Sequence, residues 1–117
     1  LKRPPKELCV TCHSKLNESM KKPKAHVHAP AARGDCLQCH VGHESRQPEL
    51  LKTAGTALCT SCHSLTEPKI TTAHGGISIK NASCTGCHDP HVSDAAGLFH
   101  PVGHKPFLGK ACSACHK

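Results

Sequence analysis

The sequence predicts a small fold that consists mostly of loops with a few short α-helices. Its own side chains are not expected to form the core. Its 117 residues fit a single domain in length. They include two Phe, one Met and no Tyr or Trp, so the bulky side chains that usually dominate a core are scarce. Gly and Pro number nine each, which favours turns. Ten Cys and twelve His make ligand chemistry the leading candidate for the organising element.

The best helix candidate lies at the N-terminal end of the chain. Pro5 suits a first helical turn, and four residues then follow at intervals of four: Leu8, Cys12, Leu16 and Met20. A second short helix is expected near residues 48–52, and loops are expected elsewhere.

One pattern, C-x-x-C-H, occurs five times. Its first cysteines are Cys9, Cys36, Cys59, Cys84 and Cys112, and its second cysteines are Cys12, Cys39, Cys62, Cys87 and Cys115. The histidines that follow are His13, His40, His63, His88 and His116. Because the pattern uses all ten cysteines, no thiol is left for another role. The sequence therefore predicts one domain over 1–117, with a loose repeat of 1–48 and 49–95 and a fifth segment over 96–117, in a chain that is complete or cut from a longer one.

This pattern is the attachment signature of c-type haem. The two thiols form thioether bonds to the porphyrin, and the adjacent histidine binds iron from one face. A zinc site or a disulfide scaffold would also use ten cysteines, but neither explains a histidine after every second cysteine. The sequence therefore predicts five c-type haems (iron protoporphyrin IX), which replace the missing core.

Seven histidines lie outside the motifs, and the single Met cannot supply the sixth ligand for five irons. We therefore expect an imidazole on both faces of each iron. His43 and His91 each follow a motif histidine by three residues, on the same side of that haem. Neither can reach the far face of its own haem, so each is expected to bind a neighbouring haem, the first and the third.

Three other histidines lie upstream of motifs. His28 and His104 each precede a first cysteine by eight residues, and each is followed by a Pro two residues later and then a Gly. We expect His28 to serve the second haem, His104 the fifth, and His74 the fourth. His26 and His100 are reserve candidates.

The stretch from Cys9 to His43, with His26-Val27-His28-Ala29-Pro30 inside it, resembles the doubled-CxxCH multihaem cytochromes of metal- and sulfur-respiring bacteria. Cys59 to His91 resembles a looser second copy. The resemblance implies closely spaced low-spin haems and an electron-transfer role in anaerobic or extracellular respiration. Because c-type haem is attached outside the cytoplasmic membrane, we expect a periplasmic or cell-surface location. We also expect redox protein partners, such as other cytochromes or a terminal reductase, and no catalytic residues of the chain's own.

Two rival functions use the same haems. A reductase needs an iron with an open coordination position, which the surplus of histidines disfavours. A subunit of a conductive filament would use a spare histidine to bind a haem in a neighbouring copy, so self-association is a second expectation. The formal charge of +7 does not indicate a nucleic-acid partner, because the aromatic residues that stack on bases are scarce. The sequence has no run of about 20 apolar residues, so it predicts no transmembrane segment.

Overall fold

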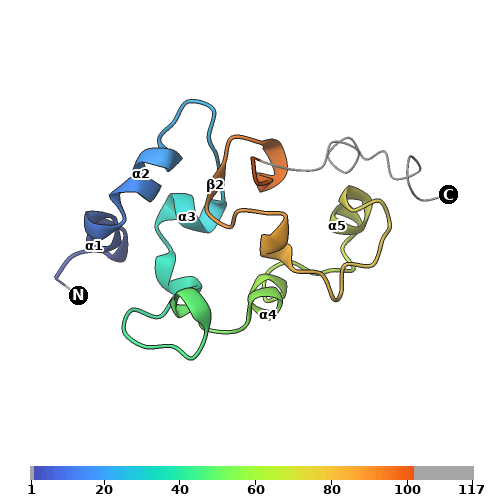
Figure 1. Ribbon diagram of the computed structural model, residues 1–117, viewed down its shortest axis with the longest axis horizontal. Helices are drawn as coiled ribbons and strands as arrows, with labels where there is room; N and C mark the ends of the chain where they lie inside the picture. Colours follow the sequence, from blue (N-terminus) through green and yellow to red (C-terminus); the bar gives the residue numbers. More distant parts are fainter. Residues whose placement is uncertain (1, 102–117) are drawn as a thin grey trace.

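A computed structural model describes residues 2–101. Its helices and strands are short and are separated by loops, which confirms the predicted fold class (Figure 1). The α-helices are α1 (Pro5–Cys12), α2 (Ser14–Met20), α3 (Ala29–Arg33), α4 (Gly55–Thr60) and α5 (Pro68–Ala73). The one-turn 3₁₀ helices are η1 (Cys36–Gln38), η2 (Pro48–Leu50), η3 (Cys84–Gly86) and η4 (Ala96–Leu98), and the strands are β1 (His26–Val27) and β2 (Val92–Ser93).

The N-terminal helical segment differs from the continuous helix that its four-residue spacing predicts. Its backbone leaves the helical region at His13 (φ −94°, ψ 47°), so α1 and α2 are separate helices. The spacing of apolar residues indicated helix on both sides of this joint, but it does not detect a break at the motif histidine.

No hydrophobic side chain is buried anywhere in residues 2–101. Large apolar side chains stay in contact with solvent, among them Leu8 at 47% and Ile77 at 63% exposure. Burial of apolar surface is the main force that drives folding, so this polypeptide lacks its usual source of stability. None of the helices in the described part of the chain is long and apolar enough to cross a membrane.

Two stretches, 36–52 and 84–100, have the same backbone arrangement 48 residues apart. In each, Nδ1 of the motif histidine bonds the carbonyl nine residues later, at 2.8 Å for His40 and 2.6 Å for His88. In each, a serine hydroxyl, Ser45 or Ser93, donates to the carbonyl six residues later. The two stretches therefore align residue by residue without a gap.

The helices that precede these stretches are also equivalent. Helix α1 packs on η1, and α4 packs on η3. From each of these helices, a side chain also donates to a carbonyl 26 residues later, upstream of the 3₁₀ helix, Lys6 to Ala32 at 2.8 Å and Thr56 to Ala82 at 3.0 Å. We call residues 5–52 the first unit and residues 55–100 the second unit.

The antiparallel strands β1 and β2 join the two units, with His26 opposite Ser93 and Val27 opposite Val92. The strands are 65 residues apart in sequence, yet they lie side by side at the centre of the molecule (Figure 1). This two-residue sheet brings the segment before α3 against the segment after the fourth motif.

Candidate functional site

Each of the four described motifs closes into a single turn. The backbone N–H of the motif histidine donates to the carbonyl of the first cysteine four residues earlier, at 2.9–3.0 Å in all four. These bonds join His13 to Cys9, His40 to Cys36, His63 to Cys59 and His88 to Cys84. Two thiols and an imidazole are therefore held on one helical turn, as covalent haem attachment with an axial histidine requires.

The first cysteines of neighbouring motifs lie close together. Burial raises the pKa of the Cys36 thiol, and the nearby Cys9 thiol raises it further. Burial likewise raises the pKa of Cys59, with a further contribution from Cys84. Within each unit, the two attachment sites are thus adjacent, and no disulfide joins any of the eight cysteines in the described range.

Six histidine rings form three pairs. The ring centroids are 6.1 Å apart for His28 and His63, 6.0 Å for His40 and His91, and 6.2 Å for His74 and His88. In every pair, one ring comes from a C-x-x-C-H motif and the other comes from outside the motifs. No two motif histidines pair with each other in the described chain.

The separation of these rings fits one metal ion between them. A metal–imidazole bond is about 2 Å long and the ring centre lies about 1 Å beyond the nitrogen, so trans ligands have centroids about 6 Å apart. Among residues 2–101, no cluster of three or more metal-binding side chains forms, so the cysteines do not converge on the four-ligand sites that structural zinc uses. The histidine pairs and the missing core both fit haem.

The second nitrogen of most paired histidines is held by the backbone. Nδ1 lies 2.6–2.9 Å from a carbonyl oxygen in four of the six, namely His28, His40, His74 and His88. A carbonyl oxygen can only accept, so Nδ1 carries the proton and Nε2 keeps its lone pair. This is the usual way in which a protein orients an imidazole for metal binding.

The ring of His91 lies beside a carboxylate instead. Its Nδ1 lies 3.8 Å from Oδ1 of Asp89, and the same oxygen accepts the backbone N–H of His91 at 2.8 Å. Burial lowers the pKa of His91, Asp89 opposes this shift, and the nearby histidines His40, His28 and His13 lower the pKa further. The neutral imidazole that metal binding requires is therefore favoured.

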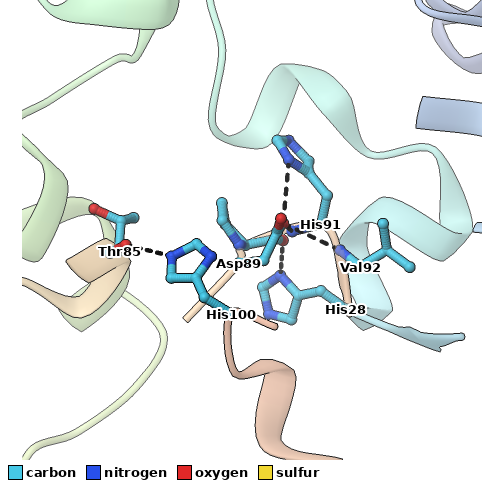
Figure 2. A network of polar contacts seen from close by, with 7 residues as sticks. His28, Thr85, Asp89, His91, Val92 and His100 are labelled. Atoms are coloured by element: carbon cyan, nitrogen blue, oxygen red, sulfur yellow. Dashed lines mark hydrogen bonds and ion pairs between the residues drawn. The ribbon is translucent and has the colours of Figure 1, made fainter. Parts of the chain in front are cut away.

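The backbone connects two of these histidines directly. The N–H of His28 donates to the carbonyl of His91 at 2.9 Å, and Nδ1 of His28 donates to the carbonyl of Pro90 at 2.9 Å. Figure 2 shows His28, Asp89 and His91 gathered at this junction. One short sheet thus positions two non-motif histidines that face different motifs.

The ring contacts of His28 and His91 differ from the motifs that the sequence predicts for them, whereas the ring of His74 lies against His88 of the fourth motif. We expected His28 near the second motif, but its ring lies against His63 of the third. We expected His91 near the third motif, but its ring lies against His40 of the second. The cause is the β1–β2 sheet, a contact between distant segments that spacing does not report.

His100 is oriented differently from the paired histidines. Its Nε2 bonds the carbonyl of Thr85 at 2.7 Å, and its backbone N–H donates to Cys87 at 3.0 Å (Figure 2). In the paired histidines Nε2 is free to bind a metal, whereas in His100 this nitrogen forms a hydrogen bond. His13, His26 and His43 have no ring partner in residues 2–101. Other predicted residues lie outside the described range, namely His104, Cys112, Cys115 and His116.

Comparison with known proteins points to the same chemistry. A family model for the doubled CXXCH motif matches residues 28–67. The chain is a doubled-CxxCH multihaem c-type cytochrome. The matched segment of this cytochrome holds the second and third motifs, whereas the stretch from Cys9 to His43, which carries the resemblance in the sequence, holds the first and second. The match begins at His28 and ends just after His63, the two members of one ring pair.

The cytochrome is also similar to the Multiheme cytochrome MtrA of Shewanella baltica (strain OS185). The two sequences are 27% identical over 111 residues, which cover 93% of this chain and 31% of that protein. The cytochrome thus spans about a third of the length of this curated relative. No solved structure matches it.

Sequence reasoning did not find Asp89 or the carbonyls that orient the rings. Asp89 follows a motif histidine directly, and nothing in its sequence position links it to the second motif. The gapless alignment of 36–52 with 84–100 was a signal that could have been found, because His40, His43 and Ser45 match His88, His91 and Ser93.

Proposed function

We propose that the cytochrome carries five bis-histidine haems in a closely spaced series and relays electrons along them, as part of anaerobic or extracellular respiration. The observation that carries this proposal is the set of three ring pairs, each of which joins one motif histidine to one histidine from elsewhere. Bound haem supplies a one-electron iron couple whose potential responds to its ligands and surroundings.

In this proposal the three pairs serve three different haems. His40 and His91 hold the second, His63 and His28 the third, and His88 and His74 the fourth. The motif cysteines attach each porphyrin, and the carbonyl bonds at Nδ1 keep each Nε2 directed to iron. The fifth motif, with Cys112, Cys115 and His116, completes the series, and His104 is its proposed second ligand.

Close spacing of the haems is supported by the contacts between motifs. The Cys9 and Cys36 thiols interact within the first unit, and the Cys59 and Cys84 thiols within the second. Cys59 also interacts with Cys39, which connects the second motif to the third. An electron that enters at one end would thus meet each site in turn. The electron donors and acceptors are other redox proteins. They are in the periplasm or at the cell surface, because c-type haem is attached outside the cytoplasmic membrane.

Mass and spin state test this proposal. The mature chain should exceed the polypeptide mass by five haems, and electron paramagnetic resonance should show low-spin ferric iron. His91→Ala, His28→Ala and His74→Ala should each convert one haem to high spin. Methionine at the same positions should keep six ligands and raise one potential, which separates ligand loss from misfolding.

His100→Ala is the matched control, because the Nε2 of His100 is bonded to a carbonyl. It should leave every haem low-spin. Fewer than five haems, or unchanged spin states in all three alanine variants, would refute the proposed function.

A further inference from the structure

Positive charge is concentrated at the N-terminal end of the described chain. Residues 2–24 contain seven Lys and Arg and two Glu, whereas residues 25–101 contain five Lys and Arg and six Asp and Glu. All nine charged side chains of residues 2–24 are exposed. Helices α1 and α2 lie on the opposite side of the molecule from α5 (Figure 1). We call residues 2–24 the basic segment.

The fold does not account for most of the cations in the basic segment. Lys6 has a structural role, because it donates to the carbonyl of Ala32, as Thr56 donates to that of Ala82 at the equivalent place. In the second unit, α4 has no charged residue, and its motif forms the same turn. The turn therefore does not need positive charge. The other six cations form no ion pair within residues 2–101, namely Lys2, Arg3, Lys15, Lys21, Lys22 and Lys24.

Three of these cations are held close together after α2. The N–H groups of Lys21 and Lys22 donate to the carbonyls of Glu18 and Ser19, and the N–H of Ala25 donates to the carbonyl of Lys22. These consecutive turns keep Lys21, Lys22 and Lys24 near one another. Because like charges repel, such a cluster opposes folding, and a partner of opposite charge relieves the repulsion.

The basic segment also contains the first haem attachment site. Cys9 and Cys12 lie in α1, and His13 joins α1 to α2. One haem brings two propionates, which are ionised near neutral pH and are fewer than the surplus positive charges of this segment. A molecule that binds here through its charge therefore binds beside the first motif.

We propose that the basic segment is the docking surface for an acidic redox protein that passes electrons to the first haem. This inference rests on the proposed function, because it requires a haem at the first motif. The reduced partner gives up one electron, which converts ferric to ferrous iron, and no bond is formed or broken. Opposite charges steer such a partner and raise its association rate about 10- to 1000-fold at low ionic strength. An anionic membrane matches less well, because it needs a helix with an apolar face, whereas Leu16 and Met20 of α2 are partly covered by the protein.

Stopped-flow reduction of the oxidised, haem-loaded 117-residue chain by a reduced acidic ferredoxin tests the inference. A variant with glutamine at Lys15, Lys21, Lys22 and Lys24 should lower the second-order rate constant about tenfold at low ionic strength. The difference should disappear at about 1 M salt, where the Debye length is about 3 Å. Arginine at the same four positions should keep the wild-type rate, because it keeps the charge.

Two controls separate docking from other effects. The matched variant removes four exposed cations elsewhere, with glutamine at Arg46, Lys52, Lys69 and Lys80, and should slow the reaction much less. Methyl viologen radical, a small cationic donor, should reduce the wild type and the first variant at the same rate.

Equal slowing in both glutamine variants, or slowing of the first variant with both donors, would overturn the inference. An unchanged ferredoxin rate in the first variant would do so as well. If the wild type then binds vesicles of phosphatidylglycerol and phosphatidylcholine and this variant does not, the surface is assigned to a membrane instead. Absence of haem from the peptide that contains Cys9 and Cys12 would refute the proposed function itself, so the two failures are distinguishable.

Discussion

Asp89 is expected to lower the reduction potential of the haem that we propose is held by His40 and His91. Its carboxylate lies 3.8 Å from Nδ1 of His91, and both side chains are 36% exposed. A negative charge here favours ferric over ferrous iron, because the ferric form carries one more positive charge. Asp89→Asn removes the charge but keeps the Oδ1 acceptor for the N–H groups of His91 and Val92. The potential of one haem should therefore rise.

The size of this rise follows from the distance and the exposure. An iron bound at Nε2 would lie about 4 Å beyond Nδ1, and two unit charges about 8 Å apart interact by about 0.5 kcal/mol in water and about 2 kcal/mol near a protein surface. The partial exposure of both groups and the spread of charge over the ligand reduce this to about 0.5–1 kcal/mol. For a one-electron couple, that range corresponds to a rise of about 20–40 mV.

Spectroelectrochemical titration measures this shift, and Asp94→Asn is the matched control. Asp94 is exposed, and its substitution removes the same charge five residues away. One couple should shift in Asp89→Asn, none should shift as much in Asp94→Asn, and the spin states should stay unchanged in both. Equal shifts in the two variants would refute a specific role for Asp89.

Three further perturbations follow from the backbone and from the missing core. Gly34→Ala should unfold the first unit at lower denaturant concentration, because Gly34 has φ +81° and a Cβ there would clash with the Lys6 side chain; an unchanged midpoint would contradict this packing. Glu49→Gly should raise stability by about 1 kcal/mol, because Glu49 has φ 54° where the repeat has Gly97; thermal melts that show no gain would contradict the strain. Polypeptide made without haem should lack helical circular dichroism, since no hydrophobic side chain in residues 2–101 is buried; native-like helix in that preparation would show that the chain folds without its cofactor.

The sequence predicted the features that depend on local spacing. Motif chemistry, the loop-rich fold and the first helical segment follow from residues within a few positions of each other. The partners of His28 and His91 could not be predicted in this way, because a sheet between residues 26–27 and 92–93 determines them. Equal eight-residue spacing before a motif suggested that His28 serves the second haem, but the chain turns at α3 and leaves His28 facing the third motif. The sequence also predicted a short helix near residues 48–52. The structure has only the single turn η2 there, and Glu49 and Leu50 both have positive φ.

The β1–β2 sheet has only two residues in each strand, too few to be stable in water without support. The proposed ligands lie at its ends: the N–H of His28 donates to the carbonyl of His91, and the two rings face different motifs. If iron holds both rings, the sheet is fixed from outside, and the His28 amide should exchange slowly with deuterium in the loaded protein. His91→Ala should release it to fast exchange, although residue 91 keeps its carbonyl. The control is His74→Ala, which removes a proposed ligand at the fourth motif and should leave the His28 amide protected. Equal protection of His28 in the wild type and in His91→Ala would mean that the sheet is stable by itself, and that the ligands of the second and third haems are not mechanically coupled.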